Sequence, residues 1–91
     1  MLYMVVENYI HGPERVYERF TAHGRLLPEG LRYLDSWVVD NEALDRCYQL
    51  GETDDPTLFD QWLDQWQDLV QFEIYPVIPS HEAASRFGSD R

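Results

Sequence analysis

Apolar side chains between residues 58 and 70 recur with the period of an α-helix, and this stripe constrains the fold more than any other feature of the sequence. They stand at i, i+1, i+4, i+5, i+8, i+11 and i+12, as Leu58, Phe59, Trp62, Leu63, Trp66, Leu69 and Val70. The spacing predicts an amphipathic helix that starts after Asp54, Asp55 and Pro56 and packs one face on a core. Trp62 and Trp66 resemble a recognition stripe, but the helical spacing favours a core role for both.

Four segments rich in β-forming residues accompany this helix. They are residues 2–10, 31–39, 44–52 and 71–78. A shorter helix is predicted from Pro13 to Gly24, because proline suits the first turn of a helix and glycine suits its end. The order of elements is therefore strand, helix, strand, strand, helix, strand.

This order predicts an α+β fold, the ferredoxin-like βαββαβ sandwich. A short polar link joins the second and third strands as a hairpin, and the sheet is expected to be antiparallel with strand order 4-1-3-2. Pro76 has no N–H to donate, which agrees with an edge position for the last strand. We assign residues 1–79 to this domain and residues 80–91 to a C-terminal tail, in which SHEAASRF favours one or two helical turns.

Side-chain alternation along the strands divides the sheet into two faces. The apolar face is expected to lie under the helices, and it carries Leu2, Met4, Val6, Leu34, Val38, Tyr48, Leu50, Phe72 and Ile74. The other face is polar and aromatic and forms the candidate pocket, made of Tyr3, Glu7, Tyr9, Tyr33, Asp35, Trp37, Cys47, Gln49, Glu73 and Tyr75. Its five tyrosine and tryptophan side chains carry on the order of 1,000 Å² of surface to bury. A soluble monomer rarely exposes so large an apolar patch, so we expect a partner or a ligand to cover this face.

The stretch HGRLLPEGLRYLDSW (residues 23–37) and the segment DRCYQL (residues 45–50) resemble a small bacterial family of unknown function in the dimeric α/β-barrel superfamily. The resemblance covers nearly the whole chain. It implies that two ferredoxin-like protomers place their sheets face to face and close a barrel around a cavity. The family has no assigned catalytic residue, so none is carried over to this sequence.

Two carboxylates of the candidate pocket, Glu7 near the end of the first strand and Glu73 near the start of the last, are expected at the same end of it. If they are held close together and partly buried, one pKa rises toward neutrality, which suits an acid or a base. In the alternative, both edge the cavity mouth and stay solvated. Cys47 is expected nearby as a buried, inert thiol, because the same face offers no cation to lower its pKa.

Charge and motifs exclude several classes of function. The net charge of −10 argues against nucleic acid and membrane as partners, although RNA-recognition domains share this strand order and an aromatic sheet face. His11, His23 and His81 form no metal motif, and no nucleotide-binding motif is present, so we expect no metal and no cofactor. A single cysteine and the lack of a recognisable targeting segment favour the cytoplasm.

Two functions remain open at this point. In the first, the protein is a homodimer that binds a small molecule, an aromatic one included, in the cavity between the sheets, either as a binder or as a cofactor-independent enzyme. In the second, the aromatic face is only the dimer interface of a structural or protein-interaction domain. An enclosed cavity in the dimer favours the first, and a filled interior favours the second.

Overall fold

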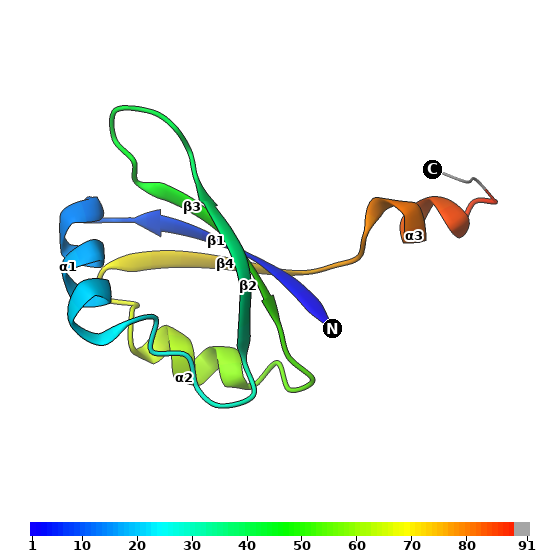
Figure 1. Cartoon of the computed structure of the whole chain (residues 1–91), viewed down its shortest axis with the longest axis horizontal. Coiled ribbons are helices and arrows are strands. Elements are labelled where there is room, and N and C mark those ends of the chain that lie inside the picture. Colours follow the sequence, from blue (N-terminus) through cyan, green and yellow to red (C-terminus); the bar gives the residue numbers. More distant parts are fainter. Residues whose placement is uncertain (89–91) are drawn as a thin grey trace.

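The strands and helices follow the predicted order, with one further helix toward the C-terminus (Figure 1). The computed structural model describes residues 1–88. Its elements are β1 (Leu2–Tyr9), α1 (Pro13–His23), β2 (Arg32–Val38), β3 (Arg46–Glu52), α2 (Leu58–Asp64), β4 (Val70–Val77) and α3 (Ser80–Ser85). The fold is α+β, and this prediction is confirmed.

The four strands form one antiparallel sheet with β1 inside it, between β3 and β4. The order β2-β3-β1-β4 is the predicted order 4-1-3-2 read from the opposite edge, and it is compatible with a ferredoxin-like arrangement. Among residues 1–88, β4 pairs only with β1, so it is an edge strand. Pro76 stands in β4 opposite Tyr3, at an edge where a missing N–H is tolerated.

The helix α2 is shorter than the apolar stripe predicted. It ends at Asp64, and Val70 already begins β4. The residues between them form turns, in which the Val70 N–H donates to the Trp66 carbonyl at 2.9 Å. The apolar side chains Trp66 and Leu69 in these turns are still buried. Trp62 and Trp66 are both buried, so their predicted place in the core is confirmed.

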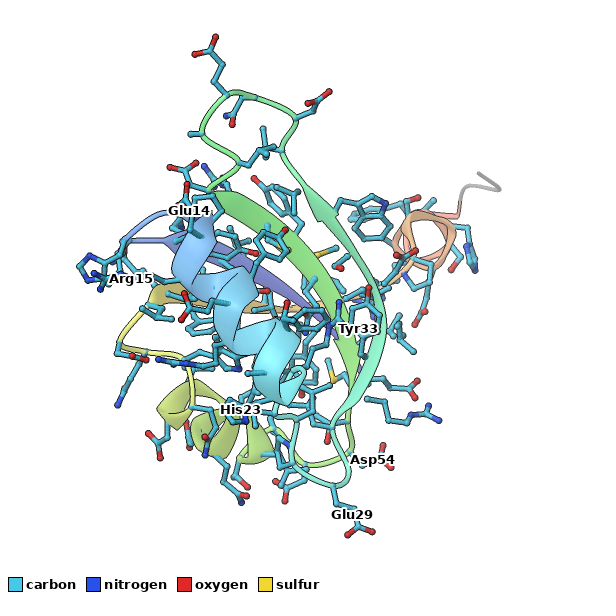
Figure 2. All side chains as sticks on the ribbon, turned by 60° about the vertical axis from the view of Figure 1, so that its left-hand side comes forward. Glu14, Arg15, His23, Glu29, Tyr33 and Asp54 are labelled. Atoms are coloured by element: carbon cyan, nitrogen blue, oxygen red, sulfur yellow. The ribbon has the colours of Figure 1, made fainter. Side chains whose placement is uncertain are left out.

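Both α1 and α2 lie on the same side of the sheet (Figure 1 and Figure 2). Aromatic rings join them to it, with centroids 5.1, 5.3 and 6.4 Å apart in the pairs Tyr3–Phe59, Trp62–Phe72 and Tyr9–Tyr17. The two helical segments are also tied to each other. Arg19 of α1 donates two hydrogen bonds of 2.7 Å to the Asp68 carboxylate and a third of 2.7 Å to the Gln65 carbonyl. These contacts fix how α1 sits above the sheet.

The C-terminal end of β4 leads away from this layered body. Figure 1 shows α3 standing apart from the sheet and from the other two helices. The helix falls within the predicted tail, whose residues 89–91 lie outside the described residues. Phe87, just after α3, is 89% exposed. Within residues 1–88, no helix has the length and apolar character needed to cross a membrane.

The face assignment made from alternation is wrong for β1 and β3. Tyr3, Glu7 and Tyr9 of β1, with Cys47 and Gln49 of β3, are buried on the side that α1 and α2 cover. The alternate residues face the uncovered side, which we call the open face. Its residues are Leu2, Met4, Val6, Asn8, Arg32, Asp35, Trp37, Arg46, Tyr48, Leu50, Glu52, Gln71, Glu73, Tyr75 and Val77. Strand alternation fixes which residues share a face, but polarity alone did not identify the face beneath the helices.

In β2, the pocket residues Tyr33, Asp35 and Trp37 were predicted to share one face, but they do not, and an irregularity in the pairing is the reason. The register shifts between Tyr33 and Asp35, so Tyr33 faces the helices while Asp35 and Trp37 face the open side. A bulge inserts one unpaired residue and reverses the alternation beyond it. The single alternation assumed for this strand could therefore not hold over its full length.

Candidate functional site

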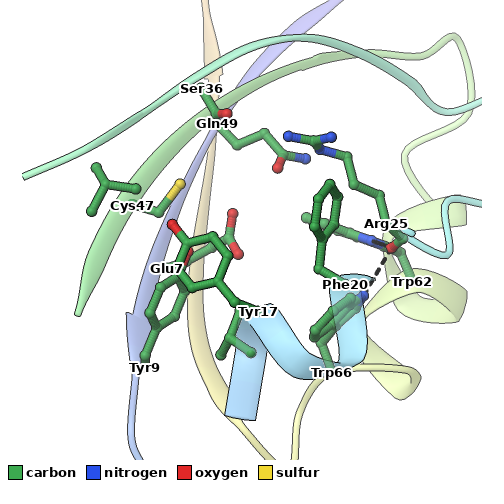
Figure 3. Close-up of a pocket in the computed structure, with 12 residues that line it drawn as sticks. Glu7, Tyr9, Tyr17, Phe20, Arg25, Ser36, Cys47, Gln49, Trp62 and Trp66 are labelled. Atoms are coloured by element: carbon green, nitrogen blue, oxygen red, sulfur yellow. Dashed lines mark hydrogen bonds between the residues drawn. The ribbon is translucent and has the colours of Figure 1, made fainter. Parts of the chain in front are cut away.

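A pocket lies between the sheet and the two helices α1 and α2 (Figure 3). The space open to the centre of a water molecule measures about 90 Å³, well above the roughly 10–15 Å³ that one water requires. Its lining comes from the strands β1, β2 and β3, from both helices and from the segments that follow them: Glu7, Tyr9, Val16, Tyr17, Phe20, Arg25, Ser36, Val38, Cys47, Gln49, Trp62 and Trp66. Tyr17 and Phe20 are partly exposed and mark the mouth, whereas the strand residues Glu7, Cys47 and Gln49 form the buried floor.

Glu7 is the distinctive group of this floor. Its side chain comes from β1, the residue is 7% exposed, and Oε2 has no hydrogen-bond partner among the described residues. Burial raises the pKa of Glu7 from its ordinary 4.5 to about 7, while the Arg25 charge and the Cys47 thiol act in the opposite direction. The carboxyl group therefore exchanges a proton near neutral pH, and its free oxygen is turned into the pocket (Figure 3).

Arg25 is the cation of the pocket, and both of its ends are held. Its backbone carbonyl accepts hydrogen bonds of 2.9 Å from the indole N–H groups of Trp62 and Trp66. Its guanidinium stacks over the Tyr33 ring, 3.6 Å from the centroid, and lies 5.0 Å from the centroid of Phe20. Among residues 1–88, no carboxylate lies in ion-pair contact with it. The cation is thus fixed in place without being neutralised.

The backbone beside Arg25 is held in an unusual conformation. Leu26 has φ of 60°, in the left-handed region that costs a leucine on the order of 1 kcal/mol. This turn directs the chain from α1 back under Trp62 and Trp66. The surrounding structure therefore maintains a strained backbone conformation directly after Arg25.

The remaining polar groups of the floor are poor nucleophiles. Burial, together with the nearby Glu7 charge, raises the pKa of Cys47 to about 11, and burial also raises the pKa of Tyr9. A thiol with this pKa is protonated at neutral pH and packs as a small apolar group, as the sequence predicted. Gln49, also buried, extends its amide toward the Arg25 guanidinium in Figure 3. Proton exchange in this pocket is left to Glu7.

The structure divides the predicted site residues between the two faces. Those that line the pocket beneath the helices are Glu7, Tyr9, Cys47 and Gln49, and Tyr3 and Tyr33 lie on the same face outside its lining. Those on the open face are Asp35, Trp37, Glu73 and Tyr75. The expected pair of carboxylates is therefore wrong: Glu73 stands opposite Val6, and Glu7 stands opposite Phe72, so their side chains leave the sheet on opposite sides.

Sequence reasoning missed Arg25, which supplies the charge of the pocket, and Ser36, Tyr17 and Phe20, which line it. Arg25 lies in the turn-rich segment after α1, where periodicity gives no direction to a side chain. One signal was available. Tyr17 and Phe20 share the inner stripe of α1 with Val16, so a polar residue just beyond that helix was a candidate for the same space.

Two side chains pin the open edge of the pocket where β2 is irregular. The Tyr33 hydroxyl and the Ser36 hydroxyl are 2.7 Å apart, on either side of the bulge. The same tyrosine ring carries the stacked guanidinium of Arg25. The bulge thus places Ser36 in the lining and Tyr33 beneath the cation, so it shapes the site directly.

Comparison with known proteins supplies the family. Searches among curated proteins and among solved structures gave no match. A family model matches residues 1–89, nearly the full length of the chain. The chain belongs to the family described as Domain of unknown function (DUF3303).

Proposed function

We propose that this domain binds a small molecule in the pocket between the sheet and the helices α1 and α2. The observation that carries the proposal is the Glu7 Oε2 atom, a buried acceptor that faces the pocket and has no partner in residues 1–88. An unsatisfied buried polar atom costs about 1–3 kcal/mol, more when it is charged, so native proteins rarely keep one without a use. A ligand that donates a hydrogen bond to Glu7 removes this cost.

The walls support the same proposal. Aromatic rings from both helices and the fixed charge of Arg25 give the mixture of apolar surface and few directed polar groups that ligand sites share. The ligand that we propose therefore lies beneath the helices, whereas the sequence predicted it in a cavity between two sheets. Because Glu7 exchanges its proton near pH 7, the pocket also has the chemistry for a cofactor-independent proton transfer.

Tryptophan fluorescence offers a direct test of binding. Trp62 and Trp66 line the pocket, whereas Trp37 lies on the open face, so a Trp37→Phe protein reports on the pocket alone. We expect small polar aromatic compounds to change its fluorescence and to raise Tm. At ten times Kd, binding stabilises the fold by about 1.4 kcal/mol, which raises Tm of a domain this small by roughly 6–11 °C.

Two outcomes of this experiment would contradict binding of a small molecule in the pocket. If no compound changes fluorescence or Tm, and native mass spectrometry finds only the bare chain, the pocket is a packing defect. A compound that raises Tm without changing the fluorescence of the Trp37→Phe protein binds elsewhere. Wild-type protein measured in parallel shows whether Trp37 itself responds.

We also propose a homodimer that buries the open face. This second proposal is supported by Trp37 and Tyr75, which are 52% and 50% exposed on that face. Aromatic side chains of this size each offer roughly 150–250 Å². The face also carries both signs of charge, with Arg46 on β3 and Glu73 on β4, as a self-complementary interface requires. A dimer whose pocket binds nothing would instead be the structural or interaction domain of the alternative.

A charge placed on the open face is expected to separate the dimer. Trp37→Lys should weaken association by at least about thirtyfold, because a central aromatic anchor is typically worth 2 kcal/mol or more. Sedimentation equilibrium measures the change, and Leu44→Lys is the matched control, since Leu44 is similarly exposed but lies in the loop between β2 and β3. A wild-type chain that sediments as a monomer at high micromolar concentration contradicts the proposal.

A further inference from the structure

The charges that line the pocket restrict the chemistry of what it binds. Arg25 is the one arginine or lysine in the lining, and the guanidinium meets no carboxylate within ion-pair distance among the described residues. A guanidinium held this way can donate two parallel hydrogen bonds to the two oxygens of a carboxylate. Its stacking on Tyr33 fixes the plane of the guanidinium, and the Gln49 amide extends toward the same group (Figure 3).

A cationic ligand fits the same space poorly. Three of the aromatic rings that attract a cation are already occupied, Tyr33 and Phe20 by Arg25 and Trp66 by Arg19. A second cation would share the pocket with the guanidinium at close range. The chain carries a net charge of −10, so this fixed positive charge is a local exception. Such an exception is informative because the rest of the molecule repels anions.

A ligand that pairs with Arg25 finds its second polar contact on the other side of the pocket, at Glu7. Glu7 Oε2 lies buried on the floor without a partner in the part of the chain that the structure describes, and a carboxyl oxygen there needs a hydrogen-bond donor. Figure 3 shows Glu7 and Arg25 separated by the open part of the pocket, with Tyr17 and Phe20 beside it. A ligand that satisfies both groups therefore has an anionic end and an O–H or N–H donor, with a flat body between the rings.

We propose that the ligand of this pocket is a small planar organic acid, whose carboxylate pairs with Arg25 and whose hydroxyl or N–H group donates to Glu7. This inference rests on the proposed function and adds the ligand class to it. The acid end explains the unpaired cation, and the donor explains the orphaned oxygen. The aromatic walls explain the planar body.

Isothermal titration with four probes of one size tests the class. The probes are 4-hydroxybenzoate, benzoate without the donor, phenol without the carboxylate, and the cation benzylamine. We expect 4-hydroxybenzoate to bind at least about tenfold more tightly than benzoate or phenol, an increment of about 1.4 kcal/mol for each directed contact. Running 3-hydroxybenzoate in parallel allows for either placement of the hydroxyl group.

Variants assign each contact to its residue. Arg25→Met should weaken 4-hydroxybenzoate at least about tenfold and leave phenol within threefold. The matched control is Arg46→Met, because Arg46 also lies over an aromatic ring, 5.4 Å from the Tyr48 centroid, but on the open face. Glu7→Met should abolish the preference for 4-hydroxybenzoate over benzoate. Circular dichroism and Tm confirm that each variant is folded, and Arg25→Gln replaces Arg25→Met if the latter is not.

The outcomes distinguish a wrong ligand class from a wrong proposed function. Binding of benzylamine or phenol as tight as that of 4-hydroxybenzoate overturns the ligand class but keeps the pocket as a binding site. Equal affinity of the acids for the Arg25→Met and wild-type proteins does the same. If the acids fail while the fluorescence screen finds another ligand, only the class is wrong. If every compound fails in both experiments, the proposed function is wrong as well.

Discussion

Replacing Glu7 with Gln is expected to remove most of the pH dependence of stability between pH 5 and pH 8. The folded-state pKa of Glu7 is about 7, above its ordinary 4.5, so the folded protein holds this proton more tightly than the unfolded chain. The contribution of Glu7 to stability is therefore greatest at low pH and falls as the pH rises from about 4.5 to about 7. The total loss is about 3 kcal/mol, because one pKa unit corresponds to 1.36 kcal/mol.

Glutamine stays neutral at every pH and has nearly the shape of the protonated carboxyl group. The Glu7→Gln protein should match the wild type near pH 4.5 and exceed its free energy of unfolding by about 3 kcal/mol at pH 8. Urea titrations at both pH values measure this difference. Other titrating groups affect both proteins alike, so they cancel in the comparison.

Glu73→Gln is the matched control for this experiment. It removes the same charge from a residue that is exposed on the open face, opposite Val6. Surface substitutions of this kind usually change stability by less than about 0.5 kcal/mol. If the stability curves of wild type and Glu7→Gln run parallel over the whole pH range, Glu7 is not a buried titrating group, and the main support for the pocket is lost.

The element order was predictable from local signals. Pro13 and Gly24 bracket α1, the apolar stripe finds α2, and Pro76 identifies the edge strand. The proline and glycine signals are confirmed because these residues restrict the backbone geometry. The stripe is confirmed because its aromatic side chains are buried in the core. The end of α2 was not predictable, since Trp66 keeps the spacing of a helix while it is held inward by turns.

The composition of the site was harder to predict than the fold. Alternation correctly grouped Tyr3, Glu7 and Tyr9 on one face of β1, and Cys47 with Gln49 on one face of β3. It could not say that this face lies under the helices, because Glu7 looked too polar for the core. Functional sites are where such local rules fail, since a buried carboxyl group is kept there for its chemistry.

Arg25 lay beyond the reach of sequence patterns for a different reason. Its position depends on the Trp62 and Trp66 indoles, 37 and 41 residues away in the chain. A loop residue has no period, so only the tertiary structure reveals that its carbonyl is anchored and its guanidinium aimed into the pocket. The dependence of Arg25 on the two tryptophans can be measured by substitution, because both indole N–H groups donate to its one carbonyl.

Removing both indole donors is expected to cost more than the sum of the single changes. In Trp62→Phe or Trp66→Phe, the remaining tryptophan still donates to the Arg25 carbonyl, so each single change costs mainly packing, roughly 1–2 kcal/mol. The double variant leaves the carbonyl without an indole donor, which adds about 1–3 kcal/mol. We therefore expect a total loss of roughly 3–7 kcal/mol in urea unfolding.

The excess over additivity is the quantity that decides this prediction. Independent sites add within about 0.5 kcal/mol, so an interaction energy above 1 kcal/mol shows that the two indoles act on one group. Affinity for 4-hydroxybenzoate should follow the same pattern, since Arg25 keeps its position in each single variant and loses it in the double variant. Strict additivity in stability would contradict the shared anchor. The anchored carbonyl fixes the backbone from which the Arg25 side chain extends into the pocket. Such a result would therefore also weaken the case for Arg25 as the acid-binding group.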